Sequence, residues 1–167
     1  MNLPNYFLAD LPPEATLGAT MIGDACQTLK RNRGRYLAHR STHSLITVLS
    51  DVAQDWLRPD YPFRKLALER GPAATGFSRS TLARGLDAFF KHLTHDQFRA
   101  LLEQDLGHAC RLDEMVSDAA EQASRRAAIA TAPTLLVHIA AGNLPSPTLS
   151  AMVLGLLARS AQFIKCA

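Results

Sequence analysis

Several features of membrane, secreted and disulfide-linked proteins are missing from this sequence. It contains no apolar run approaching the ~20 residues that span a bilayer, so we expect no membrane span. Its amino terminus lacks the basic start and apolar block of a secretory signal peptide. Its three cysteines, Cys26, Cys110 and Cys166, are odd in number and widely spread, which argues against a disulfide framework. A cytoplasmic protein is therefore the default expectation.

Glycine-rich phosphate-binding loops and complete metal-ligand sets are also missing. No G-x-G-x-x-G motif follows either of the two strands expected near the carboxyl end, so a nucleotide would have to bind without that fingerprint. His39 and His43, and likewise His92 and His95, have helical spacing, but no carboxylate or cysteine completes either pair. We therefore expect no metal site.

Charge of either sign is modest. The chain has 18 lysines and arginines against 15 aspartates and glutamates, which permits an anionic small-molecule ligand without requiring nucleic acid. A basic run, Lys30, Arg31, Arg33, Arg35 and Arg40, is typical of a solvated helix end. The other reading of this run is a nucleic-acid patch, which predicts steeply salt-dependent retention on DNA. With a single tyrosine interleaved, we expect no nucleic-acid partner.

What the sequence does contain, over its first 130 residues, is a series of helical patterns. Ser78 is suited to begin a helix, Thr94 and Gln97 form a candidate capping box, and Gly107 is suited to end a helix. The alanine-rich, charged stretch from Asp113 to about 130 favours a solvent-facing helix. The expected helical segments are 15–31, 44–57, 63–73, one from Ser78, one from Thr94 to Gly107, and 113–130.

Residues 131–167 predict a change of architecture. A short apolar run, Leu135–Ile139, indicates a buried strand, and Ser146 before Pro147 indicates an N-cap and the first position of a helix. Gly155 within that helix predicts a close helix–sheet contact, and 162–166 reads as a second strand. The expected fold is therefore α/β, with a mostly helical region (1–130) followed by the first βαβ unit of a nucleotide-binding domain (131–167). Two parallel strands would leave open sheet edges, so we expect a fragment of a longer protein.

The turn between the first strand and the helix, HIAAGNLPSP, carries the candidate chemistry. Its place after a strand is where α/β proteins bind ligands, and Asn143 could donate to a developing oxyanion or merely cap its own turn. The local sequence favours the self-capping reading. Lys165, at the end of the second strand, could contact a nucleotide ribose or phosphate, or simply be solvated. His138 is expected as a packed or hydrogen-bonded core residue, and Cys166 as a structural residue rather than a nucleophile.

Longer stretches resemble a known family. VHIAAGNLPSPTLSAMVLGLLARSAQFIKCA resembles the start of the nucleotide-binding region in LuxC-type acyl-CoA reductases, a branch of the aldehyde dehydrogenase superfamily known from bacterial bioluminescence. The upstream PFRKLALERGPAATGFSRSTLARGLDAFF and FRALLEQDLGHACRLDE are similar to the helical region of the same family. The resemblance covers the chain from about residue 45.

The resemblance implies an enzyme that reduces fatty acyl-CoA to aldehyde with NADPH, through a thioester on a cysteine. It implies that Asn143 donates to the thiohemiacetal oxyanion and that Lys165 contacts the adenosine ribose or its 2′-phosphate. Gly142 stands where aldehyde dehydrogenases usually have tryptophan, a departure typical of the reductase branch. The catalytic cysteine of the family lies downstream, so we expect these 167 residues alone to be inactive. A homo-oligomer or a reductase complex is the expected assembly.

A non-catalytic protein is the alternative. In that hypothesis the helical region is a binding or assembly module that docks a partner. The discriminating feature is whether the reading frame continues after Ala167 with a cysteine in a strand-and-loop context.

Overall fold

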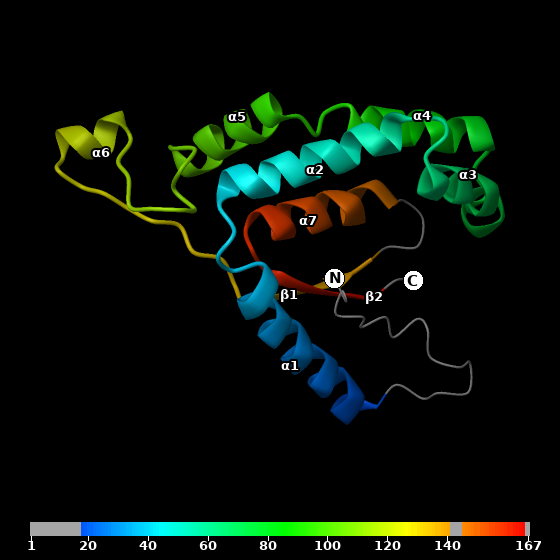
Figure 1. Cartoon of the computed structure of the whole chain (residues 1–167), viewed down its shortest axis with the longest axis horizontal. Coiled ribbons are helices and arrows are strands. Elements are labelled where there is room, and N and C mark those ends of the chain that lie inside the picture. Colours follow the sequence, from blue (N-terminus) through cyan, green and yellow to red (C-terminus); the bar gives the residue numbers. More distant parts are fainter. Residues whose placement is uncertain (1–17, 141–144, 166–167) are drawn as a thin grey trace.

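A computed structural model describes residues 18–140 and 145–165 of the protein. Helices dominate the described part of the chain, and two short strands near its end form a parallel pair (Figure 1). The elements in chain order are α1 (Ala19–Tyr36), α2 (Thr42–Leu57), α3 (Pro62–Thr75), α4 (Arg79–Phe90), α5 (His95–Leu106), α6 (Ala119–Ala123), β1 (Leu135–Ile139), α7 (Pro145–Leu157) and β2 (Ala161–Lys165).

Local hydrogen bonds explain where the central helices begin and end. The Ser78 and Thr94 side chains accept the backbone N–H groups of Thr81 and Gln97, at the first turns of α4 and α5. The predicted cap at Ser78 is confirmed, and of the predicted Thr94–Gln97 capping box the structure shows the half made by Thr94. Each such cap contributes about 1 kcal/mol to helix stability. Gly107 ends α5 at φ 77°, in the left-handed region that glycine adopts without a steric cost.

Helix α3 runs further than predicted. The predicted segment was 63–73, whereas the helix continues to Thr75 and ends at Gly76, which has φ 75°. Pro72 cannot donate its own helical hydrogen bond, but its carbonyl accepts the N–H of Gly76. The proline therefore weakens the last turn of the helix without breaking it.

The predicted helix over 113–130 is wrong. Only α6 is helical there, and Val116 and Ala128 on either side of it pair in an antiparallel bridge. A straight helix of this length would hold its ends about 27 Å apart. The bridge instead requires the chain to double back, and Arg125, at φ 53°, takes the left-handed conformation that ends α6. In Figure 1, α6 forms a small lobe at the edge of the molecule.

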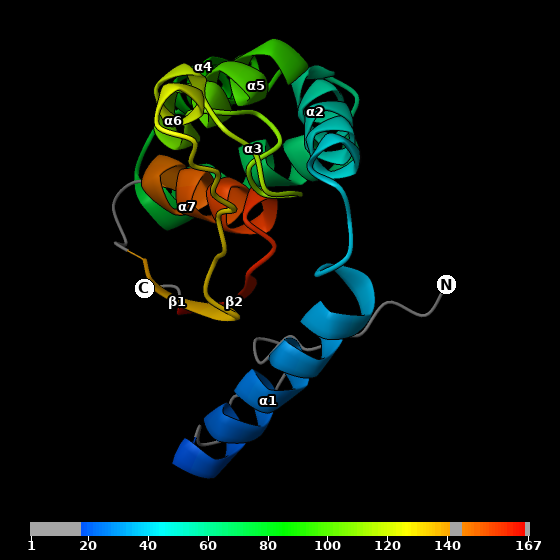
Figure 2. The same ribbon diagram turned by 90° about the vertical axis from the view of Figure 1, so that its left-hand side faces the viewer.

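The two strands and the intervening helix agree with the predicted strand–helix–strand order. The predicted burial of the first strand is wrong, because Val137 and Ile139 are 61% and 80% exposed on the face that α7 does not cover. β1 and β2 are parallel, with Leu135 opposite Ala161 and Ile139 opposite Lys165. Helix α7 begins at Pro145, so Ser146 lies inside its first turn. The predicted N-cap at Ser146 is therefore wrong. The helix lies between α2 and the strand pair, and α1 contacts the strands from the other side (Figures 1 and 2).

The hydrophobic core joins the helical region to α7. Leu45 and Ile46 of α2, Phe98 and Leu102 of α5, and Leu157 of α7 form one buried cluster. Burying each such side chain is worth about 2 kcal/mol.

Two apolar side chains of α2 lie outside the core. Val48 and Val52 are each 41% exposed, whereas Ser50 and Ala53 are buried, so the buried face of α2 does not include all its apolar residues. No helix within the described residues is long and apolar enough to cross a membrane.

Candidate functional site

The first candidate site is the carboxyl edge of the strand pair. Parallel strands end at the same edge of a sheet, and here Lys165 of β2 is opposite Ile139 of β1, where the Lys165 carbonyl accepts the N–H of Ala140 at 2.9 Å. The Lys165 side chain is exposed at this edge. Asn143, Gly142 and Cys166 lie outside the described residues. The structure therefore places one of the two predicted site residues, Lys165, at the expected strand end.

His138 is held in a hydrogen-bonded chain on the face of the strands toward α7. Its Nε2 lies 2.9 Å from Oε1 of Gln162, whose Nε2 donates to the carbonyl of Met152 at 2.8 Å. The predicted hydrogen bonding of His138 is confirmed, but the residue is half-buried and is not part of the buried hydrophobic cluster. A Cβ on Gly155 would lie 2.7 Å from the Gln162 side chain, which confirms the predicted close helix–sheet contact.

An apolar cavity of about 530 Å³ lies among α2, α3, α4 and the start of α7. Its walls combine small residues of α3 with larger apolar residues of α2, α4 and α7. The residues that line the cavity include Trp56, Ala67, Ala74, Leu86, Phe89 and Leu149. Ser146, in the first turn of α7, also lines it, so the cavity reaches the helix that follows the HIAAGNLPSP turn. Cavities of this size and character hold small apolar ligands.

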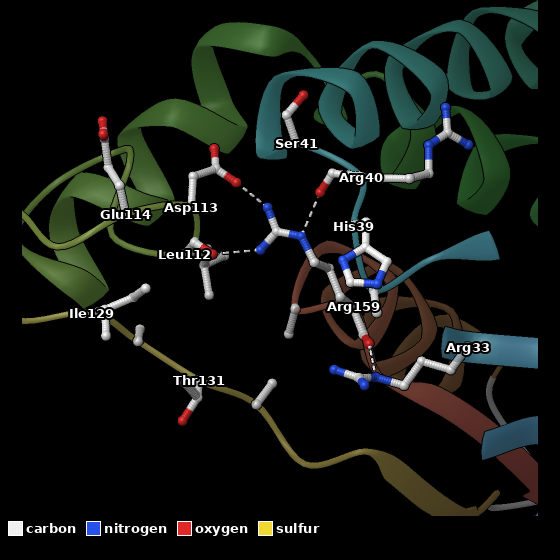
Figure 3. Close-up of a pocket in the computed structure, with 14 residues that line it drawn as sticks. Arg33, His39, Arg40, Ser41, Leu112, Asp113, Glu114, Ile129, Thr131 and Arg159 are labelled. Carbon is white, nitrogen blue, oxygen red and sulfur yellow. Dashed lines mark hydrogen bonds and ion pairs between the residues drawn. The ribbon is translucent and has the colours of Figure 1, made fainter. Parts of the chain in front are cut away.

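A second, polar pocket of about 660 Å³ lies between the α1–α2 connection and the segments 112–114 and 129–132 (Figure 3). Arg159 is the central side chain of this pocket and is only 9% exposed. Its guanidinium donates to the carbonyls of Arg40 (2.5 Å) and Leu112 (2.7 Å), to the Thr42 hydroxyl (3.0 Å) and to the Asp113 carboxylate. Because its donors are directed at acceptors of the chain itself, Arg159 acts here as a structural clamp.

The same clamp fixes the turn between α7 and β2. Arg159 has φ 59°, a left-handed conformation that is costly for a residue with a side chain. Its carbonyl accepts a hydrogen bond from the Nε–H of Arg33, with an N–O distance of 2.5 Å. Arg33 therefore has a specific partner, which the sequence reading of a solvated helix end did not foresee. The next residue, Ser160, is fully buried and donates to the carbonyl of Pro133 at 2.7 Å.

A second ion pair anchors the α6 lobe. Arg111 donates through both terminal nitrogens to the carboxylate of Glu121, which also accepts the backbone N–H of Asp118. The hydrogen bond from Arg111, helped by that from Asp118, lowers the pKa of Glu121 from its usual 4.5 to about 2. This pair was not predicted, because its partners come from different segments.

The other sequence candidates are spread over the helical region. His43 and His95, taken from different predicted pairs, approach each other with ring centroids 6.3 Å apart, and Thr47 contacts His95 at 3.3 Å. Across residues 18–140 and 145–165 there is no group of three histidine, cysteine, aspartate or glutamate side chains arranged to hold a metal. Cys26 and Cys110 are free thiols on α1 and after α5, and neither belongs to the strand edge.

The strand edge and the apolar cavity offer complementary chemistry. An exposed lysine at a strand end can pair with a nucleotide phosphate or hydrogen-bond a ribose hydroxyl, so Lys165 fits one contact of a dinucleotide. The cavity provides the water-excluding surface that a hydrocarbon group needs. In the chain, β1 ends at Ile139 before residues 141–144, and Ser146, which lines the cavity, follows them.

Comparison with known proteins gives the family of the chain. A family model described as acyl-CoA reductase (LuxC) matches residues 37–167, which is most of the chain. The match includes α2 to α7 and both strands, and it begins after α1. No curated protein matches the chain.

Proposed function

The chain belongs to the LuxC family of acyl-CoA reductases, and from this premise we propose that it forms part of an NADPH-dependent enzyme that reduces fatty acyl-CoA to aldehyde. The observation that carries the proposal is the family match over residues 37–167, which includes the strand pair and the turn bearing Asn143. The overall reaction consumes acyl-CoA, NADPH and a proton, and releases the aldehyde, free coenzyme A and NADP⁺.

A cysteine thioester is the proposed intermediate. A cysteine thiolate attacks the thioester carbonyl of the substrate, and collapse of the tetrahedral adduct releases coenzyme A as its thiol. NADPH, when bound, supplies the hydride to the enzyme-linked carbonyl. Breaking the remaining carbon–sulfur bond then releases the aldehyde and restores the cysteine. Because Cys26 and Cys110 are not at the strand edge, we place this cysteine in a part of the enzyme outside the described residues.

Asn143 and Lys165 have separate proposed roles. The Asn143 amide donates to the oxygen that becomes negative in the tetrahedral states, a contact that strengthens as charge develops. Lys165 contacts the adenosine ribose or its 2′-phosphate. The exposed position of Lys165 at the end of β2 supports this role, because nucleotides bind beyond the carboxyl ends of parallel strands.

The two roles predict different kinetic losses in the full-length enzyme. For Asn143→Ala we expect kcat for acyl-CoA-dependent NADPH oxidation to fall about 10²–10³-fold, with KM for NADPH little changed. For Lys165→Gln we expect a rise in KM for NADPH with kcat largely retained. If the full-length enzyme shows no acyl-CoA-dependent oxidation of NADPH, the proposal is wrong and the helical binding or assembly module becomes the better reading.

We further propose that residues 131–167 are the start of an aldehyde-dehydrogenase-like nucleotide-binding domain and that 1–130 are a separate helical region. The enzyme is expected to work as a homo-oligomer or within a reductase complex. Size-exclusion chromatography with light scattering on the full-length enzyme tests the assembly.

A further inference from the structure

The cavity among α2, α3, α4 and α7 has walls suited to a hydrocarbon rather than to a polar ligand. Two of its lining hydroxyls already have partners within the chain: Thr75 donates to the Gly71 carbonyl at 2.8 Å, and Thr81 shares a hydrogen bond with Ser78 at 2.9 Å. Arg70 also lines the cavity, but it is exposed, so its charge can stay in water. Apolar side chains therefore form most of the surface that a bound molecule would touch.

Two glycines line the cavity in different ways. A Cβ on Gly71 of α3 would lie 2.7 Å from Cδ1 of Leu82, so this glycine permits the close approach of α3 and α4. A Cβ on Gly85 of α4 would meet no atom within 4 Å. Glycine in the interior of a helix is unfavourable by about 1 kcal/mol relative to alanine. Since packing does not demand Gly85, its effect on the structure is to leave the cavity wide at this point.

The position of the cavity connects it with the reacting end of the substrate. Ser146 and Leu149 of α7 line it, and Ser146 follows Asn143 by three residues. Three residues span at most about 11 Å. A molecule that fills the cavity is therefore held near the turn that carries the proposed oxyanion donor.

We propose that this cavity binds the distal part of the fatty acyl chain, and that Gly85 sets the length of chain that fits. The inference rests on the proposed function, because the acyl group is the apolar part of an acyl-CoA substrate. The cavity volume, the apolar walls, the internally paired hydroxyls and the open space beside Gly85 all fit a flexible hydrocarbon.

The test compares chain-length preference in full-length enzymes with Gly85→Leu and Gly23→Leu. Gly23 is the matched control, because it is also a helical glycine with no atom within 4 Å of its Cβ position, but it lies on α1 away from the cavity. Each methylene excluded from the cavity weakens binding about four-fold. We expect Gly85→Leu to lower kcat/KM for hexadecanoyl-CoA at least ten-fold while octanoyl-CoA is little affected. Gly23→Leu should leave the whole profile unchanged.

Gly85→Ala provides a graded second variant in case the leucine disturbs folding. It should give a smaller shift in the same direction with unchanged or increased stability. An unchanged chain-length profile in both Gly85 variants would overturn the inference. A change in oligomeric state without any change in the chain-length profile would also overturn it, because the cavity would then be a docking surface for another copy of the chain.

A binding measurement separates this inference from the proposed reaction. The fluorescent fatty acid cis-parinaric acid is titrated with the full-length wild-type enzyme and with the Gly85→Leu and Gly23→Leu variants, and binding is followed by its fluorescence. Weaker binding by Gly85→Leu alone supports the cavity as the chain site even if acyl-CoA reduction is absent. Equal binding by all three enzymes, with reduction intact, refutes the cavity while leaving the proposed function in place.

Discussion

At the scale of single residues, Arg159 is the most consequential side chain in the described part of the molecule. It connects the α7–β2 turn to Arg40, Leu112, Thr42 and Asp113, which belong to the helical region and its following loop. A buried arginine is tolerated only when its donors are satisfied, and removing it would leave the Arg40 and Leu112 carbonyls without this donor and Asp113 without its counter-charge. Its value is therefore in holding two parts of the chain together.

Arg159→Met should destabilise the protein by about 3 kcal/mol, since it removes the counter-charge of Asp113, which keeps its bonds from Thr42, and takes the donor from two carbonyls, those of Arg40 and Leu112. Urea unfolding followed by circular dichroism measures the loss. Combining it with Asp113→Asn should give less than the sum of the single effects, because the two residues contact each other. Arg58→Gln is the control: its partners Asp55 and Asp60 are exposed, and no measurable change is expected. Equal effects of Arg159→Met and Arg58→Gln would contradict the clamp.

Gly155 offers a second residue-scale test. Gly155→Ala gains about 1 kcal/mol of helix propensity, but its Cβ displaces the Gln162 side chain from His138 and Met152, which costs about 1 kcal/mol for each hydrogen bond. We expect a net loss of about 1 kcal/mol in thermal or urea unfolding. In a Gln162→Ala background the same change should become stabilising, because the obstructing amide is gone. A loss that persists in that background would show that Gln162 is not the cause.

At the scale of elements, the α6 lobe depends on one ion pair and one bridge rather than on a hydrophobic core. Glu121 has a pKa of about 2 in the folded protein against an ordinary value of 4.5. A carboxylate whose pKa is lowered by folding contributes stability above its unfolded value, and that contribution disappears as the pH falls toward the folded value. The lobe should therefore loosen between about pH 4.5 and pH 2.

Glu121→Gln isolates this effect. At pH 7 it should speed hydrogen exchange of residues 116–128 relative to wild type, because the charged pair with Arg111 is lost. The difference should shrink as the pH is lowered from 4.5 toward 2, where wild-type Glu121 also becomes neutral. Exchange rates have to be corrected for the intrinsic pH dependence with unstructured peptides. A difference that stays constant over this range would show that ionisation of Glu121 does not hold the lobe.

At the scale of the whole molecule, α7 joins the strand pair to the helices. Leu157 is part of the core with α2 and α5, the strands contact α1 and α7, and Arg159 follows directly after α7 in the chain. Neither the strands nor the helical region can separate without exposing this core. We expect them to unfold as one cooperative unit.

Native-state hydrogen exchange in low urea tests that expectation. Amides of α2, α5, α7 and the two strands should converge on the same opening free energy, while α6 opens at a lower one. The contrast with α6 is the internal control, since its anchors are local. Separate opening free energies for the strand pair and for α2 would contradict a single unit.

Some features of the fold and the family were predictable from the sequence. Caps at Ser78, Thr94 and Gly107 were predictable because each depends on bonds to residues three or four positions away. Leu135–Ile139 was recognisable as a strand from its continuous apolar run, and its observed bounds are those predicted. The acyl-CoA reductase family was evident from the turn motif and is matched over residues 37–167.

Other features depended on contacts between distant segments. The alanine and charged residues of 113–130 favoured a long helix, but helix propensity is only a small preference. The ion pair of Arg111 with Glu121 and the bridge between Val116 and Ala128 outweighed it. The partners of Arg159 are as much as 126 residues away in sequence, so no local pattern could reveal them. The apolar cavity likewise needs four helices to meet, and the open space beside Gly85 exists only once they do.

The sequence by itself determined the helix boundaries set by caps, the strand–helix–strand order and the family, because these follow from short-range bonding and from motifs. Tertiary structure alone decided that Arg159 holds the strand turn, that α6 is short, and that α2, α3, α4 and α7 enclose a cavity. The physical reason is that burial and ion pairing are set by which surfaces meet, and that is a property of the folded chain.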